Sequence, residues 1–447
     1  MKKQIQRISI FLFLLPGVCP GITMPCHGQA PVSDSLLTDP TLPNIIQYAL
    51  KRQPLVQQSL IDEQTTELEI KSKLSDWYPQ VNFGYQLQHN FKVQTSVIGG
   101  NPVRLGVNNT SAFQFTASQL LFNRDVLLAR KTRGDVRLLA GQQTENTRID
   151  LVAAVSKAFY DVLTTQQQLR VSDENIGRLE RSLKDARAQF DAGIKDKTDY
   201  KRATIALNNA KASRSALDEL LRAKEDILKS LINYPEQASL PVVYDSLSLE
   251  KEIILDVATP VDYSKRIEYM MVQTQRKLAE ANISYNKWSF LPSVSANGAY
   301  NFTYLNNDFG KLYSQHFPNS YAGLTLSFPI FQGGKRKYEL EQARWELKRT
   351  DLEITRLQNA FSEEYNSALA AYKASLANYY ALKENMGLAQ EVYDVISLQY
   401  RSGIKTYLEV ISAEADLRTS RINYFNALYQ VISNKIDVQK SKGELTY

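Results

Sequence analysis

The chain has 447 residues, of which 22% are charged, and its formal net charge is +6. This basic surplus is small for the length, so it argues against a nucleic-acid partner. Two cysteines and three histidines are present, which excludes most disulfide, metal and cysteine- or histidine-based catalytic chemistry.

The N-terminal residues have the pattern of a secretory signal peptide. A basic start over 1–7 precedes an apolar run over 8–15, and Pro, Gly and small residues follow. We expect a signal peptide over 1–28, with a cut after Ala30 as the alternative.

After cleavage the mature chain would contain no cysteine, because Cys19 and Cys26 lie within or beside the signal segment. Neither follows a good lipid-attachment motif, and the sequence leaves lipidation open. His89 and His316 are then the remaining histidines, so we expect no metal site and no cofactor. Beyond the signal, no apolar run reaches the ~18 to 20 residues of a membrane-spanning helix, and entry into a membrane would require β-strands.

The rest of the chain repeats one unit twice, which is a pattern to be sought before any local interpretation. Gln-Phe-Asp-Ala-Gly-Ile-Lys at 189–195 aligns with Gln-Tyr-Arg-Ser-Gly-Ile-Lys at 399–405, and Trp-Tyr-Pro-Gln-Val at 77–81 aligns with Phe-Leu-Pro-Ser-Val at 290–294. We expect a first repeat over 31–240, an inter-repeat linker or equatorial segment over 241–260, and a second repeat over 261–447.

Each repeat begins with a helical segment, about 54 to 76 and 266 to 288, and continues into a β-hairpin, over 80–120 and over 293–330. In both hairpins apolar residues alternate with Ser, Asn, Gln and Thr, which is the period-2 pattern of a half-buried strand. A soluble hairpin packed on a core has the same alternation.

Long loops rich in Asn and Gly, over 90–110 and 305–320, join the two strands of each hairpin. Such loops favour tilted transmembrane strands that have one lipid-facing side and one wet side. The tyrosines that best suit a belt at the membrane interface are Tyr85, Tyr300, Tyr304 and Tyr321.

A long helix follows each hairpin, over 124–191 and 335–401, and a return helix follows that, over 196–232 and 406–440. At ~1.5 Å per residue each long helix would span about 100 Å, which is more than a compact domain needs. In the second long helix apolar residues recur every seven positions, as in a coiled coil. These positions are Leu340, Leu347, Ile354, Phe361 and Ala368.

Four membrane strands per chain are too few to close a barrel, because an open sheet edge in lipid leaves backbone groups unpaired. Several copies must therefore share one barrel. Two copies would give eight strands and a lumen plugged by side chains, whereas three would give twelve strands and room for a channel.

The segment Phe-Pro-Ile-Phe-Gln-Gly-Gly-Lys-Arg at 328–336 resembles the strand-to-helix signature of TolC-family outer-membrane efflux proteins. Leu-Pro-Ser-Val at 291–294 resembles the strand entry of that family, and the turn around Gly403 resembles its periplasmic tip. The likeness extends from about 41 to 440. Two departures are Asn123-Arg124 in place of a double glycine in the first repeat, and Gln53-Pro54 in place of the usual Asn-Pro.

This resemblance implies a mainly α fold with membrane β: an internally duplicated, trimeric TolC-like α/β barrel with a 12-stranded shared outer-membrane β-barrel and a long periplasmic α-helical coiled-coil barrel. It implies an exit duct of a tripartite efflux or type I secretion system in the outer membrane of a Gram-negative bacterium. The implied partners are two further copies, outer-membrane lipid, a periplasmic adaptor and an inner-membrane RND or ABC transporter. The sequence identifies neither the substrate nor the pump.

The resemblance also assigns roles near the tip. It implies a closed gate formed by Thr198, Asp199, Tyr400 and Lys405, with Lys where the best-known member of the family has Arg and hence a weaker latch. It implies a pore constriction at Glu409, with Ser412 where the family has a second acid. The residues expected at an exposed, adaptor-contacting tip are Phe190, Gly193, Ile194, Tyr400, Gly403 and Ile404.

Three other functions fit the sequence less well. Gly-x-Ser-x-Gly, P-loop and His-Glu-x-x-His motifs are absent, so we do not expect an enzyme. A self-contained porin needs eight or more strands in one chain. A periplasmic or surface coiled-coil scaffold, the main alternative, leaves the two hairpins without a purpose.

Overall fold

The computed structural model describes residues 37, 39–194, 196–242, 249–255, 262–445 and 447. The expected signal peptide and both cysteines lie outside these residues, as does part of the expected linker over 241–260. Every element below belongs to the unit formed by Asp39–Tyr447.

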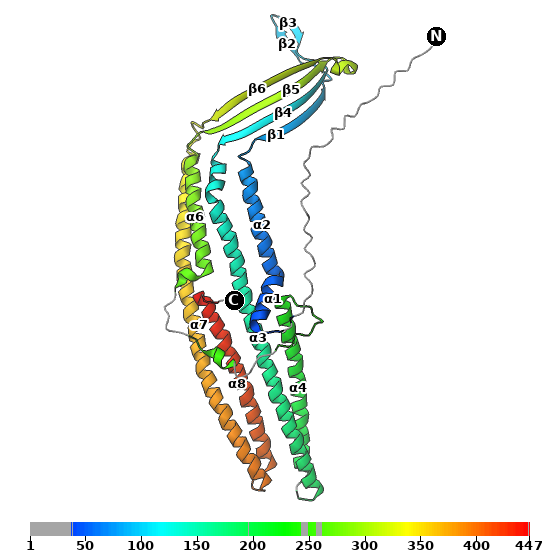
Figure 1. The fold of residues 1–447 in the computed structure, drawn as a ribbon, viewed down its shortest axis with the longest axis vertical. Helices are drawn as coiled ribbons and strands as arrows, with labels where there is room; N and C mark the ends of the chain where they lie inside the picture. The colour runs from blue at the N-terminus through cyan, green and yellow to red at the C-terminus, as the bar shows by residue number, and fades with distance from the viewer. Residues whose placement is uncertain (1–36, 38, 195, 243–248, 256–261, 446) are drawn as a thin grey trace, which may run out of the picture. The chain divides into compact units, whose positions relative to one another are not determined.

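One four-stranded antiparallel sheet contains the strands of both repeats, in the order β1-β4-β5-β6. The central pair β4–β5 joins the hairpin of the first repeat to that of the second, so the two hairpins form a continuous surface (Figure 1). The sheet is built from β1 (Gln80–His89), β4 (Asn109–Phe122), β5 (Ser293–Asn306) and β6 (His316–Ser327).

The register gives the sheet one apolar and one polar face, because residues directly opposite each other point to the same side. Phe83 lies opposite Phe115, and Phe115 lies opposite Tyr300. Tyr321, one of the expected belt tyrosines, instead lies opposite Ala299. That position is on the face that carries Thr116 and Asn82, so Tyr321 belongs to the polar face and the expectation for it was wrong.

The first long loop contains a small second hairpin, β2 (Thr95–Ile98) and β3 (Asn101–Arg104), which was not predicted from the sequence. Gly99 and Gly100 connect its strands with φ values of +63° and +86°. Two consecutive residues at positive φ form the tight turn that suits a β-hairpin. The second loop contains a short 3-10 helix, η3 (Phe309–Ser314).

Two long helices run from the sheet, and shorter helices lie end to end beside each of them (Figure 1). Along α3 lie α2 and then α4, and along α7 lie α6 and then α8; α3 also packs against α6 and α8. The helices are α1 (Leu42–Arg52), α2 (Pro54–Ser75), α3 (Arg124–Asp191), α4 (Lys197–Ile232), α6 (Ile267–Trp288), α7 (Lys335–Arg401) and α8 (Tyr407–Lys442). Two further 3-10 turns are η1 (Lys251–Ile253) and η2 (Tyr263–Lys265).

Helix α1 was not predicted from the sequence, where the first expected helix begins at about 54. The chain leaves α1 at Gln53, whose ψ of +123° is extended, and Pro54 then occupies the first turn of α2. Proline suits that position because the first N–H of a helix has no intrahelical partner. The helix expected from about 54 corresponds to α2, and the break at Gln53 separates it from α1.

The two strand-to-helix connections differ, as the Asn123-Arg124 departure indicated. Asn123 caps α3 directly, and its side chain accepts a hydrogen bond from the Asp125 backbone N–H at 2.6 Å. Before α7, Gly333 and Gly334 both have positive φ, +58° and +84°.

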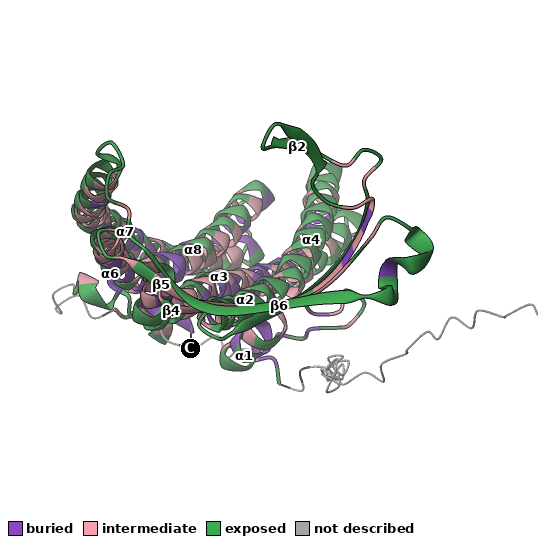
Figure 2. Ribbon diagram, turned by 90° about the horizontal axis from the view of Figure 1, so that it is seen from above, coloured by how far each residue is buried: buried purple, intermediate pink, exposed green. Residues whose placement is uncertain are grey.

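The apolar core runs between the helices, whereas all residues of β1 and β6 are exposed (Figure 2). Helices α3 and α8 pack against each other, and their buried side chains include Phe159, Leu163, Leu417 and Leu428. The heptad positions expected on α7 are buried at Phe361 and half-buried at the other four. None of the described helices is both long and apolar enough to cross a membrane.

Candidate functional site

The ends of the two helical hairpins, where α3 turns into α4 and α7 turns into α8, have the same backbone geometry. Gly193 and Gly403 have φ values of +74° and +77°. The backbone N–H of Ile194 donates to the Gln189 carbonyl, and that of Ile404 to the Gln399 carbonyl, both at 2.9 Å. This is a Schellman motif, which requires a left-handed residue and therefore favours glycine.

The residue after each glycine is apolar and faces solvent. Ile194 is 70% exposed and Ile404 is 72% exposed. Phe190 is partly exposed, and its ring stacks on Tyr200 with a centroid distance of 6.5 Å. The structure therefore places these three side chains at the outer surface of the turns.

Tyr400, which was also expected at the exposed tip, is instead buried. Its ring lies 5.6 Å from that of Tyr407, in a cluster with Ala186, Ala203 and Val410. Its hydroxyl donates to the Gln189 side chain at 3.3 Å, and burial raises the pKa of Tyr400. The expectation was wrong because the helical rotation at this position turns Tyr400 toward α3 and α4.

Lys405 and Glu409, assigned by the resemblance to a gate and to a constriction, form one ion pair. Lys405 Nζ lies 2.6 Å from Glu409 Oε1. Glu409 also accepts hydrogen bonds from the Thr406 backbone N–H at 2.9 Å and from the Thr406 hydroxyl at 3.0 Å. These contacts complete a capping box at the start of α8 and lower the pKa of Glu409 to about 2.

The other gate residues lie in the first turn of α4. The Thr198 backbone N–H donates to the Asp196 carboxylate at 3.2 Å, and that of Asp199 donates to the Asp196 carbonyl at 3.3 Å. The negative charge of Asp199 contributes to the raised pKa of Tyr400, so these two residues lie within electrostatic range. Ser412 is exposed, one helical turn after Glu409.

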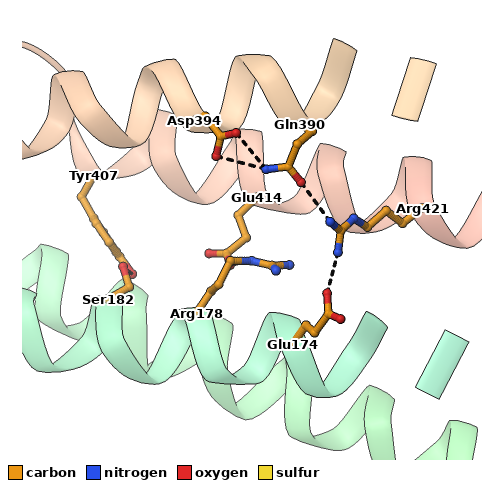
Figure 3. A network of polar contacts seen from close by, with 8 residues as sticks. All are labelled: Glu174, Arg178, Ser182, Gln390, Asp394, Tyr407, Glu414 and Arg421. Atoms are coloured by element: carbon orange, nitrogen blue, oxygen red, sulfur yellow. Dashed lines mark hydrogen bonds and ion pairs between the residues drawn. The ribbon is translucent and has the colours of Figure 1, made fainter. Parts of the chain in front are cut away.

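A polar network between the two helical hairpins was not predicted from the sequence (Figure 3). Its most buried ion pair joins Arg178 on α3 to Glu414 on α8 at 3.1 Å, and the two side chains are 14% and 4% exposed. Burial raises the pKa of the Glu414 carboxyl despite the nearby arginine.

Further contacts of this network tie α3 to α7 and α8. The Ser182 hydroxyl donates to the Tyr407 hydroxyl at 3.1 Å, and burial raises the pKa of Tyr407 to about 12. Arg421 donates to Glu174 at 2.7 Å and to Gln390 at 3.0 Å, as Figure 3 shows. Two acids, Glu414 and Asp416, lie between Ala413 and Leu417, and the sequence alone does not distinguish the buried Glu414 from the exposed Asp416.

The contacts in this region are apolar packing, hydrogen bonds and ion pairs. Among the described residues, no group of three or more His, Cys, Asp or Glu side chains could hold a metal ion. The pairs above connect α3 of the first repeat to α7 and α8 of the second.

The comparisons with known proteins point to one kind of molecule. Residues 45–233 and 268–444 match the family described as outer membrane efflux protein. The chain is 21% identical to the outer membrane protein TolC of Escherichia coli over 430 residues, which are 92% of this chain and 84% of that protein. It is 22% identical to the probable efflux pump outer membrane protein TtgC of Pseudomonas putida over 412 residues, 91% of this chain and 83% of that protein.

Solved structures share the fold. The open state of the Neisseria gonorrhoeae outer membrane channel MtrE matches with a TM-score of 0.72 and 19% identity, covering 91% of this chain and 89% of that one. The Vibrio cholerae outer membrane protein VceC matches with a TM-score of 0.71 and 12% identity, covering 90% and 96%. The expected TolC-like fold is thereby confirmed.

Proposed function

Since the chain belongs to the outer membrane efflux protein family, we propose that three copies form an outer-membrane exit duct of a tripartite efflux or type I secretion system. The observation that carries this proposal is that both lateral flanks of the chain, in the sheet and in the helices, present surfaces suited to another copy.

The sheet supports a closed ring of copies. Its outer strands are β1 and β6, and every residue of both is exposed. Successive strands are antiparallel, so β6 of one copy can pair antiparallel with β1 of the next without reversing direction. In lipid such pairing is required, because unpaired backbone groups there cost several kcal/mol each. Three copies give twelve strands.

The helices support the same ring. α7 lies at one flank, with α6 and α8 as its helix neighbours, and α2 and α4 lie beyond α3 at the other. On α7, Tyr338, Trp345 and Leu352 recur every seven residues and are 67%, 68% and 59% exposed. A second such stripe lies on the opposite flank, with Ile61 and Leu68 on α2 and Leu220 and Ile227 on α4 all exposed. Two apolar heptad stripes on opposite flanks suit side-by-side packing of copies.

The two faces of the sheet support a channel. Phe83, Phe115 and Tyr300 on the apolar face suit contact with lipid, and Asn82, Thr116 and Asn297 on the polar face suit a wet lumen. We propose that Thr198, Asp199, Tyr400 and Lys405 restrict the periplasmic end of this duct and that the Lys405–Glu409 pair belongs to the restriction.

The tips support docking of a periplasmic adaptor that is fed by an inner-membrane RND or ABC transporter. Ile194 and Ile404 are exposed apolar side chains on turns of the same backbone geometry, and such side chains suit burial against a partner. One of the relatives, TtgC, is named as a probable efflux pump outer membrane protein.

Membrane fractionation with size analysis tests the proposal. We expect the mature protein in outer membranes as a detergent-stable trimer that conducts ions in planar bilayers. Recovery from the soluble periplasm as a non-conducting species would refute the duct and favour a coiled-coil scaffold.

A further inference from the structure

A polar pocket of about 340 Å³ lies where three connections between the sheet and the helices meet. Asn123, Arg124 and Asp125 line it from the turn between β4 and α3. The connection from α6 to β5 adds Trp288 and its successors, and the connection from β6 to α7 adds Lys335 and Arg336. Both repeats therefore contribute to one site, which has no part in the gate or the tips.

Three cations line the pocket, and two of them are held in place without being neutralised. Arg336 Nη2 donates to the Pro329 carbonyl at 2.7 Å, and its guanidinium lies 4.9 Å from the centre of the Phe290 ring. The Arg124 guanidinium lies 4.3 Å from the centre of the Tyr285 ring. Carbonyls and aromatic rings orient a guanidinium but leave its positive charge available to an anion.

The two acids of the pocket offset these charges only in part. Asp125 accepts the Tyr285 hydroxyl at 2.6 Å, and Glu339 lies 3.8 Å from Lys335, one helical turn away. The pocket therefore has one positive charge in excess, which suits a group with a single negative charge, such as a phosphodiester.

Apolar side chains stand exposed beside this charged pocket. Phe328 is 54% exposed, and Ile330 and Phe331 are each 86% exposed. They follow the end of β6 and precede the basic residues of α7 in the chain. A change from exposed apolar to basic residues over a few positions is typical of a protein surface at the edge of a membrane.

We propose that this pocket binds the phosphate of a glycerophospholipid, with the acyl chains against Phe328, Ile330 and Phe331. The proposal rests on the proposed function, which places the sheet in the outer membrane. A lipid is favoured over free phosphate because the apolar side chains adjoin the cations. The bound lipid would connect the two repeats at the level where the sheet continues into the helices.

Lipid titration followed by native mass spectrometry tests the site on the full-length mature protein in mild detergent. The probes are a phosphatidylglycerol, the diacylglycerol with the same acyl chains, and glycerol 3-phosphate. The pocket variant combines Arg124→Gln with Lys335→Gln and leaves Arg336, which holds the turn, unchanged. The control combines Lys348→Gln with Arg349→Gln, an equal change of charge at exposed positions farther along α7.

We expect phosphatidylglycerol to bind the wild type and the control alike, and the pocket variant to bind about tenfold more weakly, since each basic residue near an anionic lipid contributes about 1 kcal/mol before solvent screening. Equal binding by all three proteins would overturn the site. Diacylglycerol binding as tightly as phosphatidylglycerol, or glycerol 3-phosphate doing so, would overturn the lipid phosphate as the ligand. A soluble periplasmic protein would refute the duct, whereas a membrane trimer with unaltered binding in the pocket variant refutes only this inference.

Discussion

Glu409 illustrates how a local contact fixes the charge of a residue that the family resemblance places in the pore. The Lys405 ammonium and the Thr406 N–H and hydroxyl hold its pKa at about 2, below the usual 4.5. The capping box is therefore intact above about pH 4.5, and its contribution to stability is lost as the pH falls through about 2.

This low pKa makes a prediction about ion block. If three Glu409 carboxylates line the duct, divalent cations should block conductance equally at pH 7 and pH 5, because the carboxylates remain ionised. Glu409→Gln should reduce block at both values, and Glu391→Gln, an exposed change on α7, should not. Current recordings in planar bilayers measure this. Block that titrates between pH 5 and 7, or that survives in Glu409→Gln, would remove Glu409 from the constriction.

Arg178 and Glu414 give a second prediction at this scale. Arg178→Ala leaves the Glu414 carboxylate buried without its partner, a change that costs about 3 to 5 kcal/mol in buried pairs. Arg222→Ala removes two surface ion pairs on α4, with Asp218 and with Glu219, and a surface pair contributes about 0 to 1 kcal/mol. We expect a clearly lower Tm for Arg178→Ala than for Arg222→Ala in thermal melts followed by circular dichroism.

The pH dependence of that loss follows from the raised pKa of Glu414. The folded-state pKa of Glu414 lies above its usual value of 4.5, so the folded state binds this proton more tightly than the unfolded state. Stability therefore increases as the pH falls through the raised folded pKa. The deficit of Arg178→Ala should therefore be smaller at pH 5.5 than at pH 7.5. A deficit that does not change with pH would show that the carboxylate is not the cause.

Sequence reasoning predicted which residues lie near the tip but not which way each one points. Gly193 and Gly403 were recognisable because a left-handed helix end favours glycine. The inward direction of Tyr400 and the buried Arg178–Glu414 pair depend on how α8 is rotated against α3, and one helix's pattern of residues does not determine that rotation.

At the scale of elements, the turn before α7 gives a test within one dipeptide. Gly333 and Gly334 both have positive φ, but a Cβ on Gly334 would lie 3.1 Å from the Tyr338 ring, whereas one on Gly333 meets nothing within 4 Å. The left-handed conformation costs a non-glycine residue about 1 to 2 kcal/mol, so both alanine variants should have a lower Tm than the wild type. Gly334→Ala should have the lower Tm of the two variants in thermal melts followed by circular dichroism of the purified protein. A lower Tm for Gly333→Ala than for Gly334→Ala would contradict this account.

The elements with strong periodicity were the ones that could be predicted. The long helices expected over 124–191 and 335–401 correspond to α3 and α7, whose bounds are Arg124–Asp191 and Lys335–Arg401. The hairpin β2–β3 was missed because four-residue strands are too short for alternation to stand out, although Gly99-Gly100 was a usable signal. Pairing of β4 with β5 could not be predicted, since it joins strands from different repeats.

For the whole molecule, the exposed stripe on α7 predicts how copies assemble. A wide aromatic such as Trp345 buries much of its surface when a neighbouring helix packs on it, and in a closed ring of three the same contact forms three times. Trp345→Glu would place three charges in those apolar contacts. We expect this variant to run as a monomer in size-exclusion chromatography and to lose bilayer conductance.

The matched variants separate assembly from folding. Trp345→Phe retains an apolar ring and should remain trimeric, and Gln358→Glu adds the same charge at an exposed position on α7 and should also remain trimeric. Circular dichroism of Trp345→Glu should retain the helical signal, because Trp345 is 68% exposed in the single chain. A stable trimer of Trp345→Glu would show that this stripe lies outside the contact between copies and that β1–β6 pairing holds the ring together.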